Sequence, residues 1–168
     1  MKQTRGGCIS HLGIQNCTGV TYLTVTLREV DKSNWLACTQ LQVSEQQKAT
    51  FPVPVVYWIA ESKVDSSLVP MAIDADGVLV GFLVYGVDPD DGEYWLIALL
   101  IDEKYQRQGF GRATIQELIR YLQRKFVCKK LTLGHRPDNH EAQALYKSLG
   151  FKEVGTTESE VIRSLILD

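Results

Sequence analysis

Residues 94–126, YWLIALLIDEKYQRQGFGRATIQELIRYLQRKF, place a strand-like run, a glycine turn and an amphipathic helix in direct succession. The run 94–101 is continuously apolar, which predicts a strand buried on both faces. Apolar residues then recur at 115, 118, 119, 122 and 126, the spacing of one face of a helix. Glycine is unfavourable inside regular structure, so Gly109 and Gly111 indicate a turn with a special backbone requirement.

A turn that leads from a strand into a helix exposes backbone N–H groups that have no partner within the helix. These groups carry the positive end of the helix dipole and suit a phosphate group. Gly109 and Gly111 would let the backbone approach such an anion without a Cβ in the way. Further donors come from the neighbouring side chains of Gln106, Arg107, Gln108 and Arg112. A purely structural turn without a ligand is the simpler alternative.

Two other phosphate-binding motifs do not fit this turn. The dinucleotide fingerprint G-x-G-x-x-G needs a third glycine, and Thr114 stands in that place. A Walker A loop needs the sequence G-K-[ST], which the chain does not contain.

The rest of the chain predicts an α/β (α+β) domain with a mixed, mostly antiparallel sheet flanked by helices. Strands are predicted at 22–27, 71–74, 78–87, 130–135, 151–154 and 160–167, with a hairpin at 74–77. A first helix is predicted to begin at an N-cap, Ser33, and to run into the 40s. A short second helix carries Val56, Trp58 and Ile59, and a last helix over 140–149 is closed by Gly150.

Composition and charge narrow the classes of partner. The net charge of −2 gives no electrostatic reason to expect nucleic-acid binding. No apolar run approaches the ~20 residues of a membrane span, so no membrane association is expected. The four cysteines form no C-x-x-C pair and complete no zinc site with histidine, so no metal is expected, and reduced thiols suit a cytoplasmic location. Residues 1–21 are predicted to be a loose N-terminal extension to a domain over 22–168.

Two motifs together resemble the GNAT superfamily of N-acetyltransferases. The family turn [Q/R]-x-x-G-x-[G/A] is matched at Gln106, Gly109 and Gly111, although Glu103 stands where a proline is common. The family pattern N-x-x-A-x-x-x-Y-x-x-x-G-F is matched by NHEAQALYKSLGF, residues 139–151. Within the superfamily, the segments NWLACTQLQVSEQQ, WIAES and YWLIALLIDEKYQRQGFG are most similar to bacterial diamine, spermidine and spermine acetyltransferases.

The resemblance implies the GNAT acyl-CoA N-acyltransferase fold and acetyl-CoA as co-substrate. It implies that the strand before the turn splays at a bulge and that backbone groups of Leu99, Leu100 and Ile101 bind the thioester and pantetheine. The pyrophosphate would bind the turn of Gln106, Arg107, Gln108, Gly109, Phe110, Gly111 and Arg112. Asn139 would contact the co-substrate, cap the helix that follows, or do both.

Tyr146 matches the general acid of the family, which contacts the co-substrate and protonates its departing sulfur. The alternative is that Tyr146 only fills the apolar face that it shares with Ala142 and Leu149. The sequence does not identify the base that deprotonates the amine; Glu93 is the best single candidate, ahead of Glu45, Glu61 and Asp102.

The acidic cluster of residues 88, 90, 91 and 93 would attract a polyamine or be no more than a solvated turn. Trp58 and Tyr94 would line an amine channel or pack in the core.

The predicted function is transfer of an acetyl group from acetyl-CoA to a primary amine of a small molecule, a polyamine above all. The alternatives are acetylation of a protein N-terminus, a lysine or an aminoglycoside-type amine, and a non-catalytic regulator that binds acetyl-CoA. The resemblance also implies a possible homodimer.

Overall fold

The computed structural model describes residues 14–17, 20–48 and 53–167. It contains strands β1 (Ile14–Cys17), β2 (Val20–Leu23), β3 (Thr26–Glu29), β4 (Leu68–Ala75), β5 (Val78–Val87), β6 (Tyr94–Ile101), β7 (Lys130–His135), β8 (Lys152–Thr156) and β9 (Val161–Ile166). The helices are α1 (Trp35–Thr39), α2 (Val55–Glu61), α3 (Phe110–Lys125) and α4 (His140–Ser148), with 3₁₀ turns η1 (Glu45–Gln47) and η2 (Glu103–Tyr105). No helix in these ranges is long and apolar enough to cross a bilayer.

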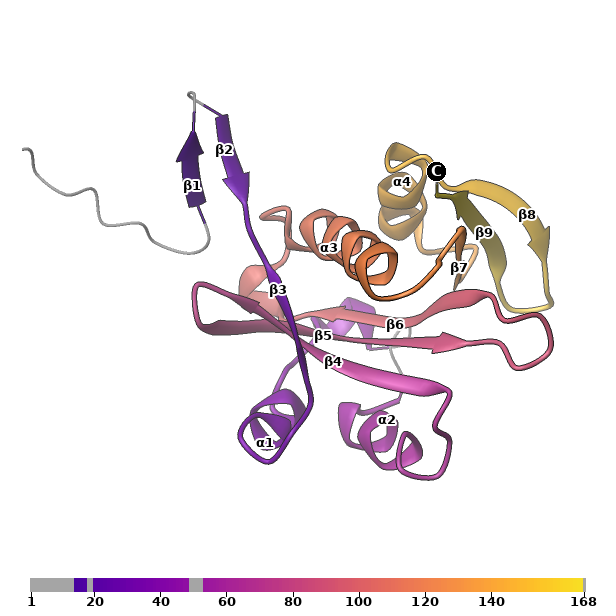
Figure 1. Ribbon diagram of the computed structural model, residues 1–168. Helices are drawn as coiled ribbons and strands as arrows, with labels where there is room; N and C mark the ends of the chain where they lie inside the picture. Colours follow the sequence, from indigo (N-terminus) through magenta and orange to yellow (C-terminus); the bar gives the residue numbers. More distant parts are fainter. Residues whose placement is uncertain (1–13, 18–19, 49–52, 168) are drawn as a thin grey trace, which may run out of the picture.

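Seven of the strands form one sheet in the order β3-β4-β5-β6-β7-β9-β8 (Figure 1). All neighbours in this sheet are antiparallel except β6 and β7, which are parallel. Helix α3 connects these two strands, as a parallel pair requires. The predicted mixed, mostly antiparallel α/β fold is therefore confirmed.

Helices cover both faces of the sheet: α1 and α2 lie on one face, and α3 and α4 on the other (Figure 1). The interior is accordingly divided into two hydrophobic clusters. The larger one packs α3 and α4 against the sheet around Ile115, Leu118 and Leu122. The smaller one packs α1 and α2 against the opposite face around Cys38 and Phe82. Cys38 and Cys128 are both buried free thiols.

The predicted hairpin joins β4 and β5. Asp76 and Gly77 both have positive φ, at 48° and 81°, which is the backbone of a two-residue turn that matches the twist of the strands. The pairing of Ala75 with Val78 closes this turn.

The prediction of one strand over 22–27 was wrong, because the chain changes pairing partner within it. Residues up to Leu23 belong to β2, which pairs with β1 in a separate two-stranded sheet. From Thr26 onward the chain pairs with β4. Leu23, Val25 and Leu27 all contact the larger cluster, so their alternation is real, but alternation does not reveal the partner. The domain limits of 1–21 and 22–168 stay a prediction.

The first helix is shorter than predicted, and Ser33 is not its cap. The Ser33 hydroxyl donates instead to Asp31 Oδ1 at 2.6 Å, and Asn34 precedes the helix. After Thr39 the chain turns toward the loop behind β6. There the N–H of Gln42 donates to Asp102 Oδ2 at 3.1 Å, and its carbonyl accepts from the N–H of Glu103. These tertiary hydrogen bonds end a helix that the sequence pattern would continue.

Candidate functional site

Strands β6 and β7 pair only at their beginnings and then separate. The parallel register runs from Tyr94 with Leu131 to Leu96 with Leu133 and stops there. On its other edge β6 pairs with β5, with a register shift in which Val84 opposes Ala98 and Tyr85 opposes Leu96. Ile97 is the extra residue of this bulge. The strand bends at a bulge, and β6 moves away from β7 beyond this point.

The prediction that β6 is buried on both faces is confirmed, with one exception at the bulge. Ile97 is 39% exposed, and Leu96 and Ala98 contribute to different hydrophobic clusters. The inserted Ile97 is the one exposed residue of β6, and it lines the cavity described below.

The separation leaves backbone groups of β6 without a strand partner. Successive residues of a strand direct their N–H and C=O groups to opposite edges. Asp102 donates its N–H to Val80 of the β5 side at 2.9 Å, while the Ile101 carbonyl accepts from Gln106 Nε2 at 2.9 Å on the open side. By this alternation Leu99 and Ile101 present their backbone groups to the open side, and Leu100 presents its own to β5.

The turn before α3 has the backbone that its glycines suggested. Gly109 has φ of +92° and precedes the helix, and Arg107 has φ of +59°. Since Gln108 has negative φ, the sign of φ alternates over these residues, and such alternation turns successive N–H groups into an anion-binding concavity. The first N–H bonded at the helix start is that of Ala113, to the Gly109 carbonyl at 3.1 Å. The N–H groups before it are available to a ligand.

Side chains of the turn hold the loop in place. Gln106 donates to Gln47 Oε1 and to the Ile101 carbonyl, and Gln108 donates to the Lys104 carbonyl at 2.9 Å. Arg107 pairs with Glu141 at 3.0 Å, and Arg112 donates to the Ser148 hydroxyl. Phe110 is fully buried with its ring edge-on to Tyr105. Backbone groups, more than these occupied side chains, are therefore the free donors of the turn.

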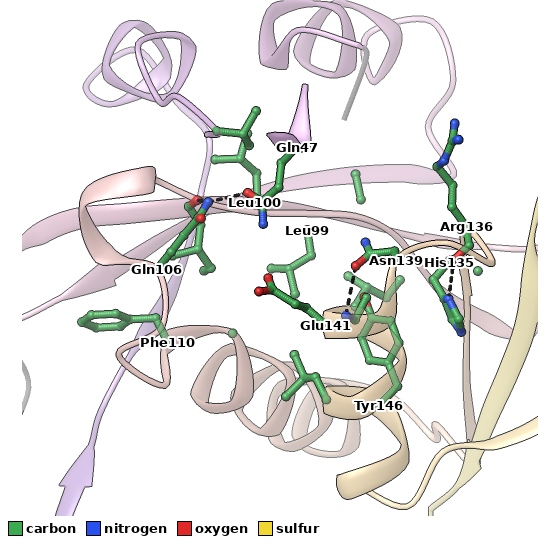
Figure 2. A pocket seen from close by; sticks show the side chains of 18 of the residues that line it. Gln47, Leu99, Leu100, Gln106, Phe110, His135, Arg136, Asn139, Glu141 and Tyr146 are labelled. Carbon is green, nitrogen blue, oxygen red and sulfur yellow. Dashed lines mark hydrogen bonds between the residues drawn. The ribbon is translucent and has the colours of Figure 1, made fainter. Parts of the chain in front are cut away.

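A cavity of about 780 Å³ lies between the open edge of β6, the start of α3 and the start of α4 (Figure 2). That volume suits a small-molecule site. Its wall includes Leu99, Leu100, Ile101, Gln106, Arg107, Gly109, Phe110, Gly111, Arg112, Asn139 and Tyr146. The structure thus brings together every residue predicted for co-substrate binding except Gln108.

Helix α4 begins at Asn139 beside the cavity. The side-chain oxygen Oδ1 of Asn139 accepts the N–H of Ala142 at 3.1 Å, so the predicted N-cap is confirmed (Figure 2). Its amide nitrogen has no hydrogen bond to the residues that the structure describes, which leaves it available to a ligand.

The other end of α4 holds Tyr146. Gly150 has φ of +91°, and its N–H donates to the Lys147 carbonyl at 3.0 Å. The N–H of Phe151 donates to the Tyr146 carbonyl at 3.0 Å, and the two rings lie 5.9 Å apart. These bonds and this contact form a Schellman motif. The predicted glycine cap therefore also fixes the backbone of Tyr146.

The Tyr146 side chain lies against the cavity and is 8% exposed (Figure 2). Burial raises the pKa of its hydroxyl to about 12 because the charged phenolate is poorly solvated there. Tyr146 is therefore a neutral hydrogen-bond donor at neutral pH.

Behind Tyr146 lies a buried polar chain that the sequence did not predict. The ring of His135 is 5.8 Å from that of Tyr146. His135 Nε2 accepts from Arg163 Nε at 3.0 Å, so the ring proton lies on Nδ1, which donates to the Arg136 carbonyl. Arg163, itself 2% exposed, also pairs with Glu153 at 3.0 Å. The sequence signal for this chain is Arg163, a charged residue at a position of the last strand where an apolar side chain would be expected.

Glu93 lies away from the cavity. It precedes β6, and its carboxylate pairs with Lys130 Nζ at 3.2 Å. The position gives no support to Glu93 as a base. The acidic cluster that ends at Glu93 is also outside the cavity wall, and Asp88 and Asp91 accept backbone N–H groups of the turn. Of the proposed channel aromatics, Trp58 lines the cavity, whereas Tyr94 packs against Phe126.

Glu45 and Glu61 are likewise not in the cavity wall. Asp102 is buried and accepts the N–H groups of Gln42 and Lys104. Glu160 does line the cavity, although no sequence motif selects it.

A strand edge opened by a bulge, facing the free N–H groups of a helix start across one cavity, defines an acyltransferase of the class that uses acyl-CoA. Residues 30–151 match the Acetyltransferase (GNAT) family. The chain belongs to this family of N-acetyltransferases, whose members use acetyl-CoA.

Two relatives differ in their acceptors. The chain is 29% identical over 136 residues, 77% of its length, to the spermine/spermidine N(1)-acetyltransferase of Bacillus subtilis, and covers 89% of it. It is 41% identical over 78 residues, 46% of its length, to the [ribosomal protein bS18]-alanine N-acetyltransferase of Escherichia coli, and spans about half of that enzyme.

A solved structure of spermidine N-acetyltransferase from Vibrio cholerae, in complex with CoA and spermine, shares the fold. The TM-score is 0.69 at 15% identity, covering 85% of this chain and 95% of that one.

Proposed function

We propose that this protein acetylates a primary amine of a small molecule, a polyamine such as spermidine above all, with acetyl-CoA as donor. The observation that carries the proposal is the cavity between the open edge of β6 and the start of α3. The polyamine enzyme of Bacillus subtilis supports the acceptor class, because it matches along most of both chains. The proposed location is cytoplasmic and the proposed assembly a homodimer.

The residues of the cavity fit acetyl-CoA. The N–H groups of Gly111 and Arg112 at the start of α3 would bind the pyrophosphate, with favourable charge from the helix dipole. Backbone groups of Leu99 and Ile101 would bind the pantetheine arm along the open edge of β6, as a further strand would. Acetyl-CoA supplies the activated acetyl group as a thioester.

Backbone donors at the bulge suit the acetyl carbonyl. Attack by an amine places negative charge on that oxygen, and fixed N–H groups stabilise it. The free N–H group of Leu99 directly follows Ile97 and Ala98, which line the cavity, so this end of the cavity is the proposed place of reaction.

Tyr146 would protonate the departing sulfur. Its pKa of about 12 exceeds that of a thiol, about 8.5, so complete transfer from an isolated Tyr146 would cost about 5 kcal/mol. We infer that Tyr146 first donates a hydrogen bond to the sulfur. It then gives up its proton as the second proton of the amine replaces it through solvent.

A second candidate is acetylation of the N-terminal residue of a protein. The observation that favours it is the 41% identity with the ribosomal-protein enzyme, which exceeds the identity with the polyamine enzyme over a shorter stretch.

A thiol-release assay with acetyl-CoA tests these acceptors side by side. The panel contains spermidine, spermine, an alanine-initiated peptide, a lysine peptide and an aminoglycoside. Release with the polyamines and not with the peptides supports the proposal, and the reverse supports the second candidate. Calorimetric binding of acetyl-CoA without turnover of any amine would identify a non-catalytic regulator.

A further inference from the structure

The carboxylate of Glu160 lies directly over Gly134, at the point where β6 and β7 begin to separate. A Cβ built at Gly134 would lie 2.5 Å from Oε2 and 2.9 Å from Cδ of Glu160. Gly134 has no positive φ, so the backbone does not need glycine. Glycine inside a strand marks a close approach by another group. The group in this case is the Glu160 carboxylate, and Gly134 provides its space.

The turn between β8 and β9 holds Glu160 in this position. The Thr157 hydroxyl accepts the N–H groups of Ser159 and Glu160, at 3.3 and 3.0 Å. The N–H of Thr157 donates to the Glu160 carbonyl at 2.8 Å. Val161 then pairs with His135, which brings the turn beside the end of β7. The carboxylate is thus placed by main-chain structure on both sides.

Glu160 also differs from the other acid of the cavity wall. Glu141 pairs with Arg107 at 3.0 Å. Glu160 makes no ion pair and accepts no side-chain hydrogen bond within the part of the chain that the structure describes. A carboxylate without a cation, at the wall of a cavity, is suited to receive a positively charged group from outside.

Glu160 is located next to the proposed place of reaction. The pairing between β6 and β7 ends at Leu96 and Leu133. Ile97 and Gly134 are therefore the first residues at which these two strands are no longer paired with each other. Both line the cavity together with Glu160 and Tyr146. Glu160 and Tyr146 therefore border one cavity, and Glu160 does so where the two strands separate.

We propose that Glu160 is the general base: it binds the ammonium group of the acceptor and takes its proton. This inference rests on the proposed function. The proton passes from nitrogen to the carboxylate and from there to solvent, since the turn is exposed. The freed nitrogen lone pair forms the C–N bond, the C–S bond breaks, and the sulfur takes its proton from Tyr146. The nitrogen loses its second proton, which restores Tyr146.

Two variants test this role: one removes the carboxylate, and the other keeps it but moves it. Glu160→Gln removes the base, and we expect kcat/KM for the amine to fall about 100-fold at pH 7. Gly134→Ala keeps the carboxylate but displaces it, because the new Cβ overlaps its oxygens. A similar fall is expected with little loss of stability, since the end of a flexible side chain can move. Gly155→Ala, in strand β8 with nothing within 4 Å of the new Cβ, is the matched control and should match wild type.

The pH dependence separates a base from a merely structural residue. Without a base only the neutral amine reacts, and its fraction rises about tenfold per pH unit below a pKa near 10.4. The deficit of Glu160→Gln should therefore shrink steadily from pH 7 to pH 10, while structural damage would give a constant deficit. The assay is thiol release from acetyl-CoA with spermidine, or with the alanine-initiated peptide if only that acceptor reacts with wild type.

An unchanged kcat/KM in Glu160→Gln, or a deficit that is the same at every pH, would overturn the role of Glu160 and leave the proposed function intact. Absence of turnover in the wild type with both acceptors would overturn the role and the proposed function together.

Discussion

Replacing Tyr146 with phenylalanine should separate catalysis from binding. The change removes one hydroxyl and keeps the ring contacts with His135 and Phe151, whose centroids lie 5.8 and 5.9 Å away. The affinity for acetyl-CoA should change little, because the proposed contacts to the co-substrate come mainly from β6 and the start of α3, and the Tyr146 hydroxyl adds a single hydrogen bond to the sulfur. Loss of proton donation should lower kcat about 100-fold.

The same variant has a predictable effect on stability at high pH. The pKa of Tyr146 is about 12 in the folded protein and about 10 in the unfolded chain. Because the folded pKa is the higher one, its stabilising contribution is complete below pH 10 and is lost as pH rises through 12. The loss is about 1.4 kcal/mol at pH 11 and approaches about 2.7 kcal/mol above pH 12.

Urea unfolding of wild type and Tyr146→Phe at pH 8 and pH 11 measures this effect. The wild type should lose about 1.4 kcal/mol relative to the variant between the two pH values. Burial also raises the pKa of Tyr85, but that residue is present in both proteins and cancels. An equal difference at both pH values would contradict the described burial, and an unchanged kcat would exclude Tyr146 as the acid.

Three further predictions concern the frame of the site. Gly109→Ala, at φ of +92°, should lower the free energy of unfolding by about 1 kcal/mol and weaken acetyl-CoA binding in calorimetry. Gly92→Ala, at φ of +72° in a remote turn, is the control: it should lower stability by as much without changing the affinity. Asn139→Ala should lower the free energy of unfolding by about 1 kcal/mol through loss of its cap; equal stability in urea would refute the cap's contribution. Arg163→Met should lower the free energy of unfolding by about 2 kcal/mol, because His135 Nε2 loses its hydrogen-bond donor. An unchanged urea midpoint would argue against this contribution.

The strand and helix around the glycine turn could be predicted from the sequence because their signals are local. The run 94–101 coincides with β6, and the helical spacing coincides with α3 except that Phe126 falls outside it. Gly109 and Gly150 mark the left-handed positions that begin α3 and end α4. In each case the backbone conformation itself demanded the residue.

The bulge of β6 and the proposed base were beyond the sequence because both arise from pairing. An apolar run looks the same with or without Ile97 as an inserted residue, and only the register with β5 reveals it. Glu160 is distant from every motif, and it meets Gly134 only because β9 pairs with β7. Glu93 was preferred for its closeness to β6 in sequence, whereas its side chain turns to Lys130.

The interior is divided into two hydrophobic clusters, so each face of the sheet has its own packing. Helices α1 and α2 pack on one face of the sheet, while the turn at Gly109 and the helix that carries Tyr146 pack on the other. The two halves still meet at the cavity, where Gln47 accepts from Gln106 of the turn and the N–H of Gln42 donates to Asp102. Packing on the two faces can therefore vary separately only as far as these hydrogen bonds, which join the first helical segment to the glycine turn, are kept.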